Sequence, residues 1–147
     1  MLSPTRILFF IHLAGFFLVT SCTRSLHNEA GVKSAMKNYD QLILKLDADS
    51  ISILFTADGN LGNVAKGRDS IKKFLASFKN IRVLSQFSTT DSIHIVGDTA
   101  VQKGKYSQTD LLSEKDTVKL KGEYTTRWEW IANEGWRIKK METNPVK

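Results

Sequence analysis

The sequence is poor in the residues that build metal centres and covalent cross-links. Its 147 residues include one cysteine, Cys22, and three histidines, at positions 12, 27 and 94. A single cysteine cannot form an intramolecular disulfide. The histidines are too widely spaced to give the short ligand spacing of a structural zinc site. The sequence therefore predicts no metal centre, and no motif in it indicates a cofactor.

Two common catalytic motifs are also missing. The glycines at positions 59, 62 and 67 are not followed by the Lys-Ser/Thr pair that ends a phosphate-binding loop. A Ser-His-Asp triad would depend on His94, which stands close to an expected hairpin turn at Gly97-Asp98 and is predicted to face solvent. The sequence therefore indicates neither nucleotide binding nor a serine-type hydrolase.

The N-terminus has the pattern of an export signal. Residues 1–21 contain one charged side chain, Arg6, followed by an apolar run at 7–19. This run is shorter than the roughly 20 residues that a membrane-spanning helix needs, and it is typical of the core of a signal peptide. We therefore predict a signal peptide over residues 1–21.

The end of this segment resembles the lipobox of bacterial lipoproteins. Leu18-Val19-Thr20-Ser21 stands before Cys22, as a triplet of aliphatic and small residues stands before the invariant cysteine of those proteins. The resemblance implies that Cys22 carries a diacylglycerol with fatty acids such as palmitate, because two acyl chains give stable anchoring. Thr23 in place of an aspartate favours the outer membrane, on its periplasmic side or at the cell surface. The alternatives are a cleaved signal that contains a cysteine, and an uncleaved anchor.

The rest of the chain is predicted to be a tether and one domain. Residues 22–30 are polar and aperiodic, so we expect a tether in which His27 is solvated, followed by a domain over 31–143. The formal charge of +6 becomes +5 without residues 1–21, because Arg6 is their one charged group. In an exported chain this balance indicates a solvated basic surface, and no nucleic-acid partner is expected.

The first half of the domain is predicted to be helical. Apolar residues recur at intervals of three and four from Val32 to Leu46, which places them on one stripe of a helix. We expect a second helix that is capped at 49–50 and ends at 57–59, with Gly59 at a positive φ. A third helix is predicted to begin at 68–69.

The second half is predicted to consist of antiparallel strands. Residues 118–130 alternate strictly in polarity, the pattern of a half-buried strand. Other alternating segments precede it at 81–107 and follow it at 136–141, where the spacing of apolar residues indicates a bulge. Gly104 and Gly122 fall on the inner face and would let the sheet bend around the helices.

The order of these segments resembles the SnoaL-like group of the nuclear-transport-factor-2-like superfamily. The resemblance covers residues 31–143. It rests on the helix with Tyr39, the turn Asp47-Ala48-Asp49, the segment Leu54 to Gly59, and the segment Lys66 to Phe74. It implies an α+β fold shaped as a cone, in which three N-terminal helices pack on a bent antiparallel β-sheet. In this fold a pocket often lies between the helices and the sheet.

Ketosteroid isomerase, a member of this superfamily, gives the sharpest test. Laid on its helical half without gaps, the sequence resembles it at Tyr39, on the oxyanion-hole tyrosine, and at Asp47 and Phe55. Asn63 falls on the position of the general-base aspartate, and Thr126 falls near the protonated aspartate of the oxyanion hole. Because a neutral amide cannot take a proton from carbon, the resemblance does not extend to the isomerase chemistry.

The inner face of the predicted sheet carries aromatic side chains and a few neutral polar groups, the usual lining of a small-molecule pocket. We expect a lipid-anchored, non-catalytic protein that binds a small apolar or aromatic ligand, or a protein partner. The alternatives are an acid–base enzyme of isomerase, dehydratase or hydrolase type in the same pocket, and an assembly subunit. An inward-facing Glu123 or Glu129 would favour the enzyme, and aromatics that fill the cone would disfavour the pocket. The predicted ligand-binding residues are Tyr39, Asn63, Tyr106, Tyr124, Thr126, Trp128 and Trp130.

The outer face of the sheet is predicted to be basic. Charged outer faces are normal for antiparallel sheets, so a solvated face is the first interpretation. Docking to anionic lipid head groups is the second. A homodimer through this face, which is common in the superfamily, would need acids from the partner, because burying many cations is costly. The cations are Lys103, Lys105, Lys119, Lys121 and Arg127, with Arg137 and Lys139 at the edge.

Overall fold

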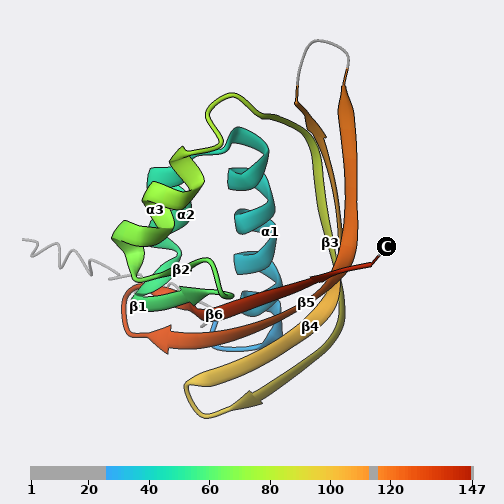
Figure 1. Cartoon of the computed structure of the whole chain (residues 1–147). Helices are drawn as coiled ribbons and strands as arrows, with labels where there is room; N and C mark the ends of the chain where they lie inside the picture. Colours follow the sequence, from blue (N-terminus) through green and yellow to red (C-terminus); the bar gives the residue numbers. More distant parts are fainter. Residues whose placement is uncertain (1–25, 113–115, 147) are drawn as a thin grey trace, which may run out of the picture.

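The computed structural model describes residues 26–112 and 116–146, which form three helices on a curved six-stranded sheet (Figure 1). The predicted signal peptide, the lipidation site Cys22 and the first part of the tether lie outside the described residues. In chain order the elements are α1 (Glu29–Lys45), α2 (Ala48–Ile53), β1 (Phe55–Leu61), β2 (Ala65–Lys66), α3 (Arg68–Ala76), β3 (Arg82–Val96), β4 (Thr99–Leu111), β5 (Thr117–Ile131) and β6 (Gly135–Pro145).

The sheet is mixed. Its strand order is β2-β1-β6-β5-β4-β3, and neighbouring strands are antiparallel except for β1 and β6, which are parallel. The predicted α+β class is confirmed, whereas the purely antiparallel sheet is wrong. The cause is the segment at residues 55–61, which joins the sheet beside β6 instead of completing a helix.

β1 takes the place of the end of the predicted second helix. Asp47, not a residue at 49–50, caps α2 by accepting a hydrogen bond from the Ser50 amide at 3.0 Å, and the helix is only six residues long. Phe55 then enters the strand and is fully buried. Gly59 lies inside the strand without a positive φ, where an added Cβ would meet the backbone of β6 at 3.0 Å. Because β1 and β2 lie between α2 and α3 in the sequence, the three helices are not consecutive elements at the N-terminus.

α1 is the helix that the sequence predicts, and it lies against the concave face of the sheet (Figure 1). Asn28 caps it by accepting from the Gly31 amide at 3.0 Å. Leu46 ends it in the left-handed conformation, with a φ of 47°. The predicted apolar stripe faces the sheet and contributes the buried side chains Val32, Met36 and Ile43.

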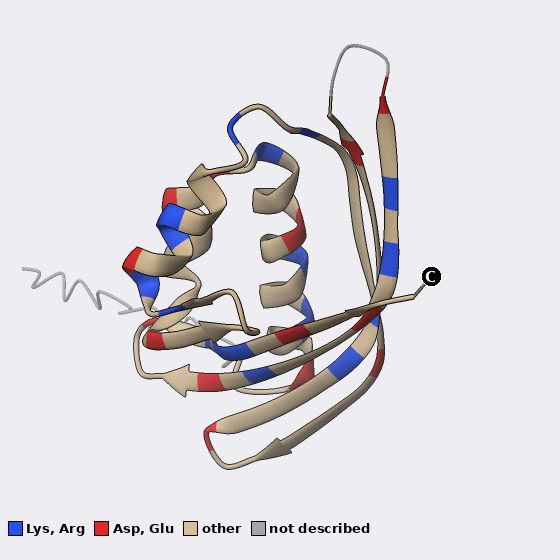
Figure 2. Cartoon of the chain, viewed as in Figure 1, with Lys and Arg blue, Asp and Glu red and all other residues tan. Residues whose placement is uncertain are grey.

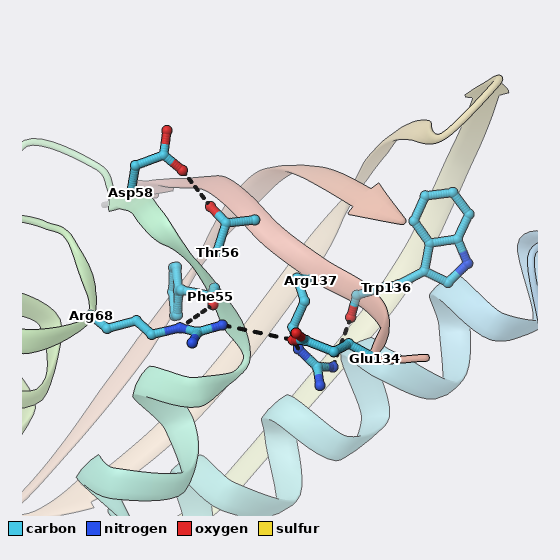
Figure 3. A network of polar contacts seen from close by, with 7 residues as sticks. All are labelled: Phe55, Thr56, Asp58, Arg68, Glu134, Trp136 and Arg137. Carbon is cyan, nitrogen blue, oxygen red and sulfur yellow. Dashed lines mark hydrogen bonds and ion pairs between the residues drawn. The ribbon is translucent and has the colours of Figure 1, made fainter. Parts of the chain in front are cut away.

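A polar network fixes the start of α3 against β1 and β6 (Figure 3). Arg68 donates from Nε to the carbonyl oxygen of Phe55 at 2.8 Å. Its guanidinium also lies 3.9 Å from the carboxylate of Glu134, which pairs with Arg137 at 3.3 Å. The helix therefore begins at the predicted position, and a side chain that reaches back to β1 holds it there.

Two glycines permit the bend of the sheet. An added Cβ at Gly104 would overlap the carbonyl oxygen of Thr89 on β3, and one at Gly122 would overlap that of Asn144 on β6. At both places a neighbouring strand comes closer than any side chain would allow. This agrees with the prediction that these two glycines let the sheet bend. The curvature brings the ends of the long strands around α1, as Figure 1 shows.

β6 contains a bulge at the predicted place. Arg127 of β5 pairs with Lys140, and the next residue of β5, Trp128, pairs with Ile138, so Lys139 has no partner in the register. Because of this extra residue, Ile138 and Met141 both face the core and are buried.

The last residues of the predicted tether fold against the domain, and the prediction that His27 is solvated is wrong. Its ring stacks on Trp130 with centroids 4.7 Å apart. Its Nε2 lies 3.3 Å from the carboxylate of Asp98, in the hairpin turn between β3 and β4. The Trp136 indole also donates to the carbonyl oxygen of Leu26 at 3.0 Å. Aromatic stacking therefore ties the chain to the sheet before α1 begins.

Lysines and arginines recur along β4, β5 and β6 (Figure 2). Two of the predicted cations form ion pairs: Arg137 with Glu134 at 3.3 Å, and Lys139 with Asp58 at 2.7 Å. The others make no ion pair within residues 26–112 and 116–146. These exposed residues are Lys103, Lys105, Lys119, Lys121 and Arg127.

Candidate functional site

A cavity of about 570 Å³ lies between α1, α3 and the concave face of the sheet. It opens between the β1–β2 turn and the end of β6, because its lining residues at 63–64 and 143–144 are exposed. Its inner walls come from buried apolar side chains of four elements. These are Met36 and Ile43 of α1, Leu75 of α3, Val83 of β3 and Met141 of β6.

Four of the seven predicted ligand-binding residues line this cavity. Tyr39 comes from α1, Tyr106 from β4 and Tyr124 from β5, so three phenols from three elements converge on one space. Asn63 also lines it, but as an exposed residue at the mouth. The positions of these four residues fit the predicted role, which stays a prediction.

The other three predicted residues do not line this cavity, and Trp128 and Trp130 instead border a second hollow beside the start of α1. Trp128 is 1% exposed and donates from Nε1 to Oε1 of the fully buried Gln102 at 3.0 Å. Gln102 in turn donates to the Thr90 hydroxyl at 2.8 Å. Thr126 is fully buried, and its hydroxyl has no hydrogen-bond partner in the described part of the chain. Trp130 stacks on His27 instead. Trp128 and Thr126 are therefore core residues, whereas Trp130 is half-buried and lies beside the start of α1.

The carboxylate that lines the cavity wall is Asp110, which is not among the residues predicted from the sequence. Glu123 and Glu129 lie on the outer face, where Glu129 is 3.5 Å from Lys139. Asp110 is 7% exposed and lines the cavity. Both of its side-chain oxygens accept from Nε2 of Gln108, at 2.8 and 2.9 Å. Asp110 continues the even-numbered inner face of β4, so the alternation could have indicated it. The sequence predicts a strand that ends at Ser107, three residues earlier.

A second carboxylate stands behind the cavity wall. Asp40 of α1 accepts hydrogen bonds from three donors of β3: Gln86 Nε2 at 2.9 Å, Ser88 N at 3.0 Å and Ser88 Oγ at 2.8 Å. Gln86 and Ser88 both line the cavity. With its amide nitrogen bound to Asp40, Gln86 presents a buried Oε1 that has no partner among the described residues. Less than 1 Å² of this oxygen is accessible, so it lies within the wall and does not face the open cavity.

The phenols of the cavity are held in their neutral form. Burial raises the pKa of Tyr39 well above its usual value, and the nearby charge of Asp40 raises it further. Burial likewise raises the pKa of Tyr124 and of Tyr106. Tyr124 donates to the Thr89 carbonyl at 3.1 Å. The proton of Tyr124 is therefore already used, whereas the neutral phenol of Tyr39 can act as a hydrogen-bond donor in the cavity, and Asp110 is the lining carboxylate suited to accept a proton.

The described part of the chain contains neither a cluster of metal ligands nor a membrane-spanning helix. Within residues 26–112 and 116–146, no group of three or more His, Cys, Asp or Glu side chains is placed to hold a metal ion. Among the helices of that same part of the chain, none has the length and apolar character needed to span a membrane.

Comparison with known families decides the membership of the chain. The family model described as "SnoaL-like domain" matches residues 24–142. The chain belongs to the SnoaL-like domain family. This confirms the resemblance drawn from the order of sequence segments. No curated protein matches the sequence.

Solved structures of low sequence identity share the fold of this SnoaL-like domain. A ketosteroid isomerase-like protein from Erwinia carotovora atroseptica has a TM-score of 0.70 at 15% identity, over 80% of this chain and 95% of that chain. A nuclear transport factor 2-like protein with a cystatin-like fold from Novosphingobium aromaticivorans has a TM-score of 0.68 at 18% identity, over 83% of this chain and 84% of that chain. A nuclear transport factor 2-like superfamily protein from Salmonella enterica serovar Typhimurium has a TM-score of 0.67 at 16% identity, over 83% of this chain and 92% of that chain. At these identities the likeness shows the fold and no activity.

Proposed function

We propose that the SnoaL-like domain binds a small, largely apolar molecule in the cavity between α1, α3 and the sheet. The observation that carries this proposal is the cavity itself. Its volume of about 570 Å³ falls within the range of roughly 300–1,000 Å³ that is usual for small-molecule sites. Apolar walls with a few convergent polar groups are the usual composition of such sites, and here those groups include Tyr39 and Asp110.

Native mass spectrometry of the full-length chain, purified from the cells that make it, tests the proposal directly. A copurified molecule that is lost when the cavity is blocked would support it. Leu61→Trp blocks the cavity, because Leu61 is a half-buried lining residue. Leu44→Trp is the matched control on the exposed side of α1, where the side chain is 40% exposed. Equal ligand occupancy in both variants would refute the proposal.

Asp110 favours a second candidate, acid–base catalysis in the same cavity. A buried carboxylate can remove a proton from carbon while a neutral phenol such as Tyr39 stabilises the resulting oxyanion, and general acid–base catalysis contributes about 10²–10⁴-fold. Deuterium exchange of the carbon acid 2-tetralone, followed by NMR, tests this role. The full-length chain should accelerate exchange, and Asp110→Asn and Tyr39→Phe should each remove most of the acceleration. Binding of 2-tetralone without exchange would leave only the binding function.

We also propose that the domain is anchored to the cell envelope through a lipid on Cys22. The support is the lipobox-like sequence that ends at Cys22, which lies outside the described residues. Cys22→Ser should leave the precursor unprocessed and abolish incorporation of labelled palmitate. Unchanged labelling of this variant would exclude the anchor.

A further inference from the structure

The cavity contrasts in charge with the rest of the protein. The chain carries a formal charge of +6, yet among residues 26–112 and 116–146 no lysine or arginine lines the cavity. Two carboxylates do line it, Asp110 in the wall and Glu142 near the mouth, and Asp40 stands directly behind the wall. Glu142 is paired with Lys140 at 2.8 Å, whereas Asp110 has only the neutral Gln108 amide as a side-chain partner in the described ranges.

The wall formed by β3 and β4 has unused acceptor capacity. A carboxylate has about four lone-pair sites, and the single nitrogen of Gln108 occupies only part of those on Asp110. Gln86 Oε1 is buried with no partner among the described residues. Its amide cannot be reversed without breaking the bond from its nitrogen to Asp40 at 2.9 Å. A buried acceptor without a donor is costly, but less than 1 Å² of this oxygen is accessible, so the acceptor left for a ligand in the cavity is the Asp110 carboxylate.

Asp110 and its partner Gln108 stand on one wall of the cavity. Gln86 is directly opposite Gln108 in the β3–β4 register, and Asp110 is directly opposite Val83, with a register shift between Val83 and Ser85. Gln108 and Asp110 are two positions apart and therefore point to the same side. Gln86, Gln108 and Asp110 all line the cavity, so Asp110 forms part of a polar wall opposite the apolar side chains of α1.

We infer that the ligand of this cavity carries a protonated amine on an apolar or aromatic body, an inference that rests on the proposed binding function. An ammonium group has several N–H donors and no acceptor, which matches a wall that offers a carboxylate with unoccupied acceptor sites. The apolar body fills the space between Met36, Ile43 and Leu75. A carboxylate or phosphate ligand would meet Asp110 with no cation to compensate, so the same cavity disfavours anions.

Three probes of matched shape test the inference on the full-length chain by isothermal titration calorimetry at neutral pH. They are 2-(2-naphthyl)ethylamine, 2-(2-naphthyl)ethanol and 2-naphthylacetate. The amine should bind about 10- to 100-fold more tightly than the alcohol, the range expected for hydrogen bonds to a charged group. The acetate should bind more weakly than the alcohol. If the alcohol binds as tightly as the amine, or the acetate binds best, the inference is wrong although the binding function stands. If no probe binds, the binding function itself fails for ligands of this class.

A pair of variants assigns the effect to the cavity wall. Asp110→Asn should reduce amine binding to the level of the alcohol, and an unchanged far-UV circular dichroism spectrum and melting temperature would show that the variant is folded. Glu123→Gln makes the same change of charge on the exposed outer face of β5 and should preserve the preference for the amine. An amine preference that survives Asp110→Asn, or is lost in Glu123→Gln, would overturn the inference. Should Asp110→Asn not fold, the order of the three probes on the unaltered chain still decides it.

Discussion

Gly104→Ala is the sharpest test of how the sheet obtains its curvature. A methyl group at this position would overlap the carbonyl oxygen of Thr89 and lie 2.8 Å from the hydroxyl oxygen of Tyr124. The hydroxyl belongs to a side chain that can adjust, but the carbonyl belongs to the backbone of β3 and cannot rotate away. Accommodation therefore requires β3 to move off β4 at the bend, where the ladder from Arg82 to Val96 already shifts register between Thr90 and Ser92.

The expected cost follows from the nature of this contact. Extra methyl groups in packed regions cost about 1–3 kcal/mol, and a clash with backbone belongs at the upper end. At roughly 4 °C per kcal/mol for a domain of this size, the melting temperature of Gly104→Ala should fall by about 12 °C. Gly97→Ala is the matched control: it has nothing within 4 Å but a φ of +54°, so it should cost only the left-handed penalty of about 1–2 kcal/mol.

Differential scanning calorimetry and urea denaturation of the full-length chain measure both values. If Gly104→Ala melts within a few degrees of the unaltered chain, or less far below it than Gly97→Ala, the bend is not held by backbone approach and the argument fails. A second consequence separates the two variants. Because Tyr124 lines the cavity, Gly104→Ala should also weaken binding of the naphthyl probes, whereas Gly97→Ala should not.

Three further predictions concern single side chains. Gln102→Leu should lower the free energy of unfolding by about 1–3 kcal/mol in urea denaturation, because the buried Trp128 indole loses its acceptor; a neutral effect would contradict the network. Above pH of about 10 the unfolded chain should release the Tyr39 proton before the folded chain does, because burial raises the pKa of the folded phenol. Stability should therefore fall with pH more steeply in the unaltered chain than in Tyr39→Phe, by at most about 1.4 kcal/mol per pH unit, and parallel pH profiles would exclude this. His27→Ala should cost about 1 kcal/mol through lost stacking on Trp130 without changing probe binding, and a fully stable variant would show that the tether contact contributes nothing.

The elements that could be predicted from the sequence are those whose pattern is long and local. The stripe of α1 repeats over four turns, and the alternation on β5 covers thirteen residues, so a single period fits each. β1 could not be found in this way. Leu54-Phe55 followed by Ala57 fits a helix as well as a strand, and the choice depends on parallel pairing with β6 about eighty residues later. Tertiary pairing therefore overrode the local signal.

The candidate site shows the same division between local and non-local information. The phenols of Tyr39, Tyr106 and Tyr124 were found because inward-facing aromatics are visible in the periodicity. Asp110 was missed because the inner-face pattern of β4 was expected to stop at Ser107, whereas pairing with β3 and β5 extends the strand to Leu111. His27 was misplaced because its aromatic and acidic neighbours come from the β5–β6 region and the β3–β4 turn, far from it in sequence.

The inner face of β5 shows why alternation alone does not distinguish a core from a binding site. From Trp130 to Leu120 every second residue points to the same side, but α1 covers that side unevenly. Trp128 and Thr126 are sealed beneath the start of the helix, Tyr124 borders the cavity beside its second half, and Leu120 lies at the rim with 39% exposure. The same alternation on β5 therefore includes core residues, a residue of the cavity wall and a surface residue. The boundaries depend on where the helices end, so the ligand-binding positions are determined by α1 and α3 as much as by the strand that presents them.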